Sequence, residues 1–217
     1  MIQDKGESLE GKRVMLVGAG KVARSCAEKL LEYGAIPLSF SDASGHVYEP
    51  DGITEGKLNT IKQIKDERGA LLGRYIISST TAQFNNPENI FDIPCDICIP
   101  CGAMNAIDDA AVQKLADNGC QAVIEGGQGC VTPSARKALK KRGVAYGPHT
   151  MTLTGPSIVH ALGPDATDEQ LKEECARIYK EVKNTASEFN ARGDLFAGAN
   201  IAGFLRVANV MMMQGAV

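Results

Sequence analysis

The stretch from Gly11 to Leu31, GKRVMLVGAGKVARSCAEKLL, decides the fold of this chain. Within it, Arg13 to Val17 is a compact aliphatic run, which is typical of a strand buried on both faces. A G-x-G-x-x-A turn follows at once, and apolar residues then recur at helical spacing until Gly34 ends the helix. A strand, a glycine turn and a helix in this order predict the first unit of an α/β domain.

The turn has the residues that a dinucleotide phosphate site requires. Gly18 permits the tight turn, Gly20 lets a pyrophosphate approach the backbone, and the small Ala23 lets the helix pack closely on the strand. The N-terminus of the helix adds amide groups and the positive end of the helix dipole. We therefore predict dinucleotide binding here; the alternative is a tight strand–helix turn that binds nothing.

Composition narrows the class of protein. With 217 residues, of which 44% are hydrophobic and 23% charged, the chain is an ordinary globular protein with a substantial core. A net charge of −3 excludes a broad basic surface for nucleic acid or an acidic membrane, and we expect no stretch long and apolar enough to cross a bilayer. The seven cysteines lack disulfide spacing, so reduced thiols in the cytoplasm or another reducing compartment are expected.

Strands and helices alternate along the rest of the chain. The expected strands are 35–41, 75–77, 96–99, 121–125 and 144–146, and the expected helices are 54–65, 108–117, 132–142, 167–190 and 201–214. This alternation predicts a doubly wound parallel sheet with C-terminal helices. We expect residues 1–10 to be a linker-like lead-in, 11–166 to form an NAD(P)-binding Rossmann-like domain, and 167–217 to be helices packing on it, with a loop-rich 147–166.

Two of these helices carry further expectations. The lysines of the 54–65 helix should form a solvated face. In the 201–214 helix, Phe204, Leu205, Ala208 and either Met211 or Met212 should point inward.

Polar residues follow several of the expected strands. Asp42 ends the second strand, where an acid can accept hydrogen bonds from an adenosine ribose. Asp42 could also open a turn over residues 42–45, and both roles can hold together. Because Ser41 and Ser44 could face a 2′-phosphate, these residues do not settle NAD against NADP. Ligands of open α/β sheets lie beyond the C-terminal ends of the strands, so Gly102 to Asn105 is a candidate for the nicotinamide half.

Cys95, Cys98 and Cys101 form a C-x-x-C-x-x-C pattern that invites a metal interpretation. In an extended strand, Cys95 and Cys101 would lie roughly 20 Å apart and Cys98 would point to the opposite face. We therefore expect buried structural thiols and assign no metal ligand. Cys101, at the end of the strand, is the one that could line a pocket.

Five stretches in order resemble the cofactor-binding domain of hexameric glutamate dehydrogenases: GKRVMLVGAGKVA, SDASGHVYEPDG, CDICIPCGAMN, GCQAVIEGGQG and FAGANIAGFLRVANVMMMQG. The resemblance extends from about Leu9 to Val217. It implies a Rossmann-like domain that binds NAD(P). In the family, this cofactor oxidises glutamate to 2-oxoglutarate and ammonia, or the reaction runs in reverse.

The resemblance also implies a set of cofactor-binding residues. They are Gly18, Gly20, Lys21, Val22 and Ala23 in the phosphate turn, Ser41 and Asp42 at the adenosine ribose, Ala103 and Asn105 at the nicotinamide ribose, and Glu125 and Gln128 in the turn matching the family's Glu-Gly-Ala-Asn. The serine–aspartate pair has the form of the NADP-using members, and so NADP is favoured over NAD.

Departures from the family pattern leave two functions open. Gly127-Gln128 replaces the family's Ala-Asn, and residues 150–157 depart from its Lys-Ala-x-Asn-Ala-Gly-Gly-Val run. The family's N-terminal substrate domain, which supplies the catalytic lysine and aspartate, is absent from these residues, so we assign no catalytic residue. The chain is either the cofactor domain of an amino-acid dehydrogenase or a non-catalytic nucleotide-binding or interaction module. Besides the dinucleotide, its expected partners are a separate substrate-domain chain or a second copy, contacting Met211 to Met213 and Val217; neither nucleic acid nor membrane is expected.

Overall fold

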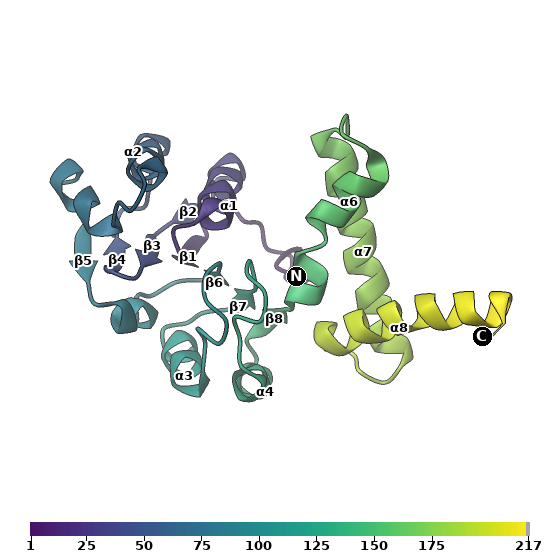
Figure 1. Cartoon of the computed structure of the whole chain (residues 1–217). Helices are drawn as coiled ribbons and strands as arrows, with labels where there is room; N and C mark the ends of the chain where they lie inside the picture. The colour runs from purple at the N-terminus through teal and green to yellow at the C-terminus, as the bar shows by residue number, and fades with distance from the viewer. Residues whose placement is uncertain (216–217) are drawn as a thin grey trace. The chain divides into compact units, whose positions relative to one another are not determined.

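The structure is a computed structural model that describes residues 1–215, apart from the side chain of Lys5 (Figure 1). The chain divides into two compact units, Met1–Ala145 and Tyr146–Val217. Val217, which we expected at an exposed surface, lies outside the described residues.

The predicted parallel sheet has the strand order β2-β1-β6-β7-β8, and its first four strands in this order lie within the first unit. The strands are β1 (Arg13–Val17), β2 (Ile36–Pro37), β6 (Ile97–Pro100), β7 (Ala122–Ile124) and β8 (Ala145–Gly147). Helix α1 (Lys21–Glu32) lies on one face, and α3 (Asp109–Asp117) and α4 (Pro133–Lys141) lie on the other (Figure 1). The strand β1 is an interior strand, paired with β2 on one side and β6 on the other, which is why Val14, Met15 and Leu16 are fully buried.

Capping side chains set the starts of three helices in the first unit. Thr54 Oγ1 accepts the amide of Lys57 at the start of α2 (Glu55–Asp66), Asp108 caps α3, and Thr132 caps α4 ahead of Pro133. Each oxygen satisfies an amide that has no partner within its helix. Helix α2 buries Leu58, Ile61 and Ile64, the stripe that its spacing indicates.

The expected second strand, 35–41, is not continuous. Only β2 pairs with β1, and β3 (Ser39–Asp42) instead joins β4 (Gly45–Tyr48) and β5 (Gln83–Asn85) in an antiparallel sheet. A two-residue hairpin loop, Ala43-Ser44, connects β3 to β4, so the turn predicted at 42–45 is confirmed. The hairpin escaped prediction because β4 is short, and because the partner strand β5 comes from far along the chain.

The strand expected at 75–77 is wrong. These residues belong to a 3₁₀ helix, η2 (Leu72–Ser78), which buries Leu72 and Tyr75 at a spacing of three. The remaining 3₁₀ turns are η1 (Gln3–Lys5) and η3 (Pro87–Asp92). The lead-in at 1–10 is not purely a surface linker, since Ile2 joins the core at 8% exposure.

The second unit contains α5 (His149–Thr152), α6 (Gly155–Leu162), α7 (Asp168–Glu188) and α8 (Leu195–Gln214). A capping box begins α7: Gln170 Oε1 accepts the Thr167 amide at 2.9 Å, and Thr167 Oγ1 accepts the Gln170 amide at 3.3 Å. Residues 147–166 are less loop-rich than expected, because they form α5 and α6. These two helices contact α7 and α8, which is why the compact unit begins at Tyr146.

Helix α8 differs most from expectation. It begins at Leu195, capped by Asp194, and not at Ile201. Phe204, Met211 and Met212, expected to point inward, are 69%, 51% and 75% exposed. The expectation that no stretch could cross a bilayer is also wrong by length and composition. The 20-residue α8 has a mean hydropathy of 1.4 in its most apolar window, and only 11% of that window is buried.

Candidate dinucleotide site

The loops that follow β1, β6 and β7 lie together at the carboxyl edge of the parallel sheet. The Cys101 amide donates to Val17 O at 2.7 Å, which joins the ends of β1 and β6. The amides of Gly126 and Gly127 both donate to Pro100 O at 2.9 Å, which joins the loop after β7 to β6. This edge is where open α/β sheets bind their ligands.

The two glycines of the turn have different reasons to be glycine. Gly18 has a φ of +121°, and a Cβ there would lie 3.2 Å from the carbonyl carbon of Cys101. Gly20 has an ordinary φ of −73°, and a Cβ there would meet nothing within 4 Å. The fold therefore requires glycine at position 18, whereas glycine at position 20 leaves space open in front of α1.

The N-terminus of α1 faces this space without an acceptor of its own. Its cap residue, Gly20, makes no side-chain capping bond, and its first turn contains no acidic residue. Lys21 and Val22 are exposed, whereas Ala23 is fully buried against the sheet. The free backbone amides and the positive end of the helix dipole thus face the open space at Gly20. This arrangement could bind a pyrophosphate.

Ser41 and Asp42, expected at the adenosine ribose, are both engaged within the protein. Ser41 is 9% exposed, and its Oγ accepts the Gly18 amide at 2.8 Å. The Asp42 carboxylate accepts four hydrogen bonds, from Ser44 N, Ser44 Oγ, Lys65 Nζ and Leu72 N. Burial by itself would raise the pKa of the Asp42 carboxyl, but bonds from Lys65, Ser44 and Leu72 bring this pKa below its usual value. The turn-opening role of Asp42 is confirmed, and its ribose contact stays a prediction.

Lys65 is the residue that sequence reasoning missed at this edge. We expected the lysines of α2 to be solvated, yet Lys65 Nζ lies 2.8 Å from Asp42 Oδ2 with its side chain only 19% exposed. Lys57 and Lys62 are also paired, with Glu49 and Glu28. Helical spacing predicts which face of α2 is polar. It does not predict that acidic residues of other elements form ion pairs with that face.

The residues expected at the nicotinamide half divide into surface and buried groups. Ala103, Asn105 and Gln128 are exposed on the loops after β6 and β7. Asn105 has a left-handed φ of +58°, and its amide donates to Gly129 O at 2.9 Å, which ties the two loops together. Glu125 is only 1% exposed, and its Oε1 accepts the Val131 amide. Glu125 therefore stabilises the loop after β7 through a buried hydrogen bond.

The cysteines of β6 are thiols packed in the interior. Cys95 and Cys98 are buried, and burial raises the pKa of the Cys98 thiol. Cys101 is half-buried at the strand end, where a Cβ on Gly126 would lie 2.6 Å from its Sγ. Among the residues that the structure describes, no group of three or more His, Cys, Asp or Glu could hold a metal ion.

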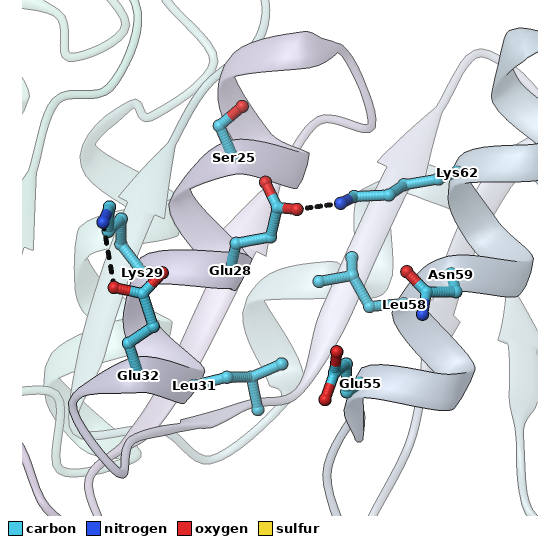
Figure 2. A pocket seen from close by; sticks show the side chains of 9 residues that line it. All are labelled: Ser25, Glu28, Lys29, Leu31, Glu32, Glu55, Leu58, Asn59 and Lys62. Carbon is cyan, nitrogen blue, oxygen red and sulfur yellow. Dashed lines mark hydrogen bonds and ion pairs between the residues drawn. The ribbon is translucent and has the colours of Figure 1, made fainter.

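A separate pocket of about 530 Å³ lies between α1 and α2 (Figure 2). The side chains of Glu28 and Lys62 meet across it as an ion pair, and Lys29 is paired with Glu32 at 2.9 Å. Both lysines of this pocket are therefore already neutralised by carboxylates. The glycine turn is not part of its lining.

A doubly wound sheet with an open glycine cradle at its carboxyl edge defines a Rossmann-like dinucleotide-binding domain. The sequence model of the family described as Glutamate/Leucine/Phenylalanine/Valine dehydrogenase matches residues 1–215, and the chain belongs to this family.

Individual relatives agree with this assignment. The chain is 37% identical to the NADP-specific glutamate dehydrogenase of Chlorella sorokiniana over 230 residues, covering 100% of the chain and 44% of that relative. It is 31% identical to the NAD(P)-specific glutamate dehydrogenase of Xylanibacter ruminicola over 226 residues, covering 99% of the chain and 51% of that relative. The crystal structure of Plasmodium falciparum glutamate dehydrogenase superposes with a TM-score of 0.94 at 30% identity, covering 100% of the chain and 49% of that protein. The chain thus spans about half the length of the curated relatives that it matches.

Proposed function

We propose that this chain is the nicotinamide-dinucleotide-binding part of a glutamate dehydrogenase. The observation that carries the proposal is the open space at Gly20, in front of a helix N-terminus with no capping side chain and no acid in its first turn. A pyrophosphate is the ligand group that matches this cradle. The family membership supports nicotinamide as the second half of the ligand.

The residues at the edge of the sheet would bind and orient the dinucleotide. The amides of the Gly18–Ala23 turn would hold its phosphates, and the loops carrying Asn105 and Gln128 would face its nicotinamide half. When bound, the dinucleotide supplies the hydride acceptor or donor of the reaction. Glu125 and the Asn105–Gly129 bond keep those two loops in place.

We further propose NADP as the preferred dinucleotide. An acid at the end of the second strand favours NAD when it can accept bonds from a ribose 2′-hydroxyl. Here the Asp42 carboxylate already accepts four bonds, one of them from the Lys65 ammonium. The pairing neutralises the carboxylate that would otherwise repel a 2′-phosphate, and several relatives are named NADP-specific.

The second candidate function is nucleotide binding without turnover by this chain alone. It is favoured by Gln128, which stands where the family has asparagine. Catalysis would then depend on a partner chain that carries a substrate site. The exposed apolar residues of α8 offer a surface for such a chain or for a second copy.

Equilibrium titration and turnover assays separate the two functions. The chain should bind NADP more tightly than NAD, with binding detected by calorimetry. Glutamate-dependent reduction of NADP by the purified chain would identify it as a complete catalyst. Tight NADP binding without turnover would establish the second function, and the absence of binding to either dinucleotide would contradict both.

A reducing compartment is also proposed, because all seven cysteines are unbridged.

A further inference from the structure

Two serine side chains join the antiparallel sheet to β1. The strand β3 turns away from the parallel sheet after Leu38, whose amide donates to Val14 O at 2.8 Å. Beyond this point, Ser39 Oγ donates to Leu16 O at 3.2 Å, and Ser41 Oγ accepts the amide of Gly18 at 2.8 Å. Ser39 is fully buried and Ser41 is 9% exposed. Hydroxyl groups thus bond to the backbone of β1 and of the turn that follows it.

Ser41 holds both backbone polar groups of Gly18. Its hydroxyl accepts the Gly18 amide, and its own amide donates to Gly18 O at 3.2 Å. Gly18 is the first residue of the phosphate turn and has the left-handed φ of +121° that sets the path of the next residues. Because a partly buried amide that loses its partner is destabilised, removing this hydroxyl should free Gly18 to reorient.

We propose that Ser41 is a positioning residue for the phosphate turn, not a ligand of the adenosine ribose or of a 2′-phosphate. The inference rests on the proposed function of the turn. The Ser41 Oγ accepts the Gly18 amide, and at 9% exposure the side chain offers little surface to a 2′-phosphate. The cradle at Gly20 depends on the conformation of Gly18, which makes Ser41 a determinant of affinity for every pyrophosphate ligand.

The test compares Ser41→Ala with two matched variants. Ser39→Ala removes a buried hydroxyl from the same strand, but one bonded to Leu16 and not to the turn. Ser41→Thr keeps the hydroxyl, and threonine is favourable in a strand, so this variant should behave like wild type. It keeps the test informative if Ser41→Ala does not fold. Each variant is titrated with NADP, NAD and ADP, and hydrogen exchange of the Gly18 amide is followed by NMR without ligand.

The positioning role predicts one pattern of results. In Ser41→Ala the Gly18 amide should exchange about tenfold faster, and affinity for all three nucleotides should fall by a similar factor, about tenfold. Ser39→Ala and Ser41→Thr should leave both quantities within about twofold of wild type. A loss confined to NADP would overturn the proposal in favour of direct 2′-phosphate contact, and unchanged Gly18 exchange would overturn it outright. Wild-type chain that binds none of the nucleotides would instead contradict the proposed function of the turn, whereas the exchange of Gly18 reports on Ser41 independently.

Discussion

Asp42 at the end of β3 and Lys65 near the end of α2 form a shielded ion pair, with Lys65 Nζ 2.8 Å from Asp42 Oδ2. Their side chains are only 14% and 19% exposed. The Lys65 ammonium neutralises the Asp42 carboxylate at the edge of the sheet where an adenosine ribose would lie. The pair therefore sets the net charge that a bound dinucleotide meets there. Both the stability of the first unit and its choice of dinucleotide should therefore depend on Lys65.

Lys65→Gln should lower the free energy of unfolding by about 1–2 kcal/mol at pH 7, because Asp42 loses a charged donor while shielded. The pKa of the Asp42 carboxyl is lower in the folded protein than in the unfolded chain, where it is about 3.9. The stabilisation is therefore complete above this unfolded pKa, and it is lost as the pH falls through the pKa of the folded protein. Urea denaturation at pH 7 and at acidic pH measures the difference. Lys62→Gln, which removes the more exposed pair with Glu28, is the control and should cost about 0.5 kcal/mol. An equal loss in both variants would contradict the special role of Lys65.

Lys65→Gln should also reduce affinity for NADP more than affinity for NAD, by about tenfold in the ratio, because the Asp42 carboxylate loses its counter-charge and repels a 2′-phosphate. Competitive titration of the same protein sample with both dinucleotides gives this ratio directly. A proportional loss for both would mean that Lys65 acts only through the structure of the edge.

Glu49→Gln should destabilise the first unit by about 3 kcal/mol. The Glu49 carboxylate is completely buried and accepts hydrogen bonds from Tyr75, Ser79, Thr81 and Lys57. A glutamine would turn an NH₂ group toward donors and leave the Lys57 ammonium without its counter-charge. Urea unfolding measures the change, with Glu67→Gln, an exposed partner of Arg74, as the control near zero. A loss below about 1 kcal/mol would contradict the stabilising role of this buried cluster.

The exposed apolar residues of α8 should cause the chain to self-associate. Phe204, Val207, Met212 and Met213 are each more than half exposed, and exposed apolar side chains gathered on one helix favour association. Sedimentation velocity over a wide concentration range should show mass rising with concentration, and a Phe204→Gln, Met212→Gln double variant should shift toward monomer. Monomeric wild type throughout would contradict this. Co-flotation with lipid vesicles is the companion measurement, since α8 is also long enough to enter a bilayer.

Much of the first unit follows from local sequence, because its signals act over a few residues. The strand–turn–helix at Arg13 to Glu32 and the caps at Asp108 and Thr132 are of this kind. The antiparallel sheet is different, since β5 is short, exposed and paired only through distant contacts. The site divides in the same way. The glycine turn can be predicted from local sequence, whereas the bond between Ser41 and Gly18 depends on where β3 leaves the parallel sheet. The spacing of apolar residues in α8 predicts a buried face, but the described residues of this chain leave Phe204 and Met212 exposed.

The most direct test of the dinucleotide cradle is calorimetric titration of Gly20→Val with NADP and NAD. Gly56→Val in the first turn of α2 is the matched control, because a Cβ at either glycine meets open space and neither position requires a positive φ. We predict that Gly56→Val binds like wild type, while Gly20→Val keeps its fold and loses binding of both dinucleotides by at least about a hundredfold. Wild-type affinity in a folded Gly20→Val would contradict the account, because the phosphates would then lie elsewhere.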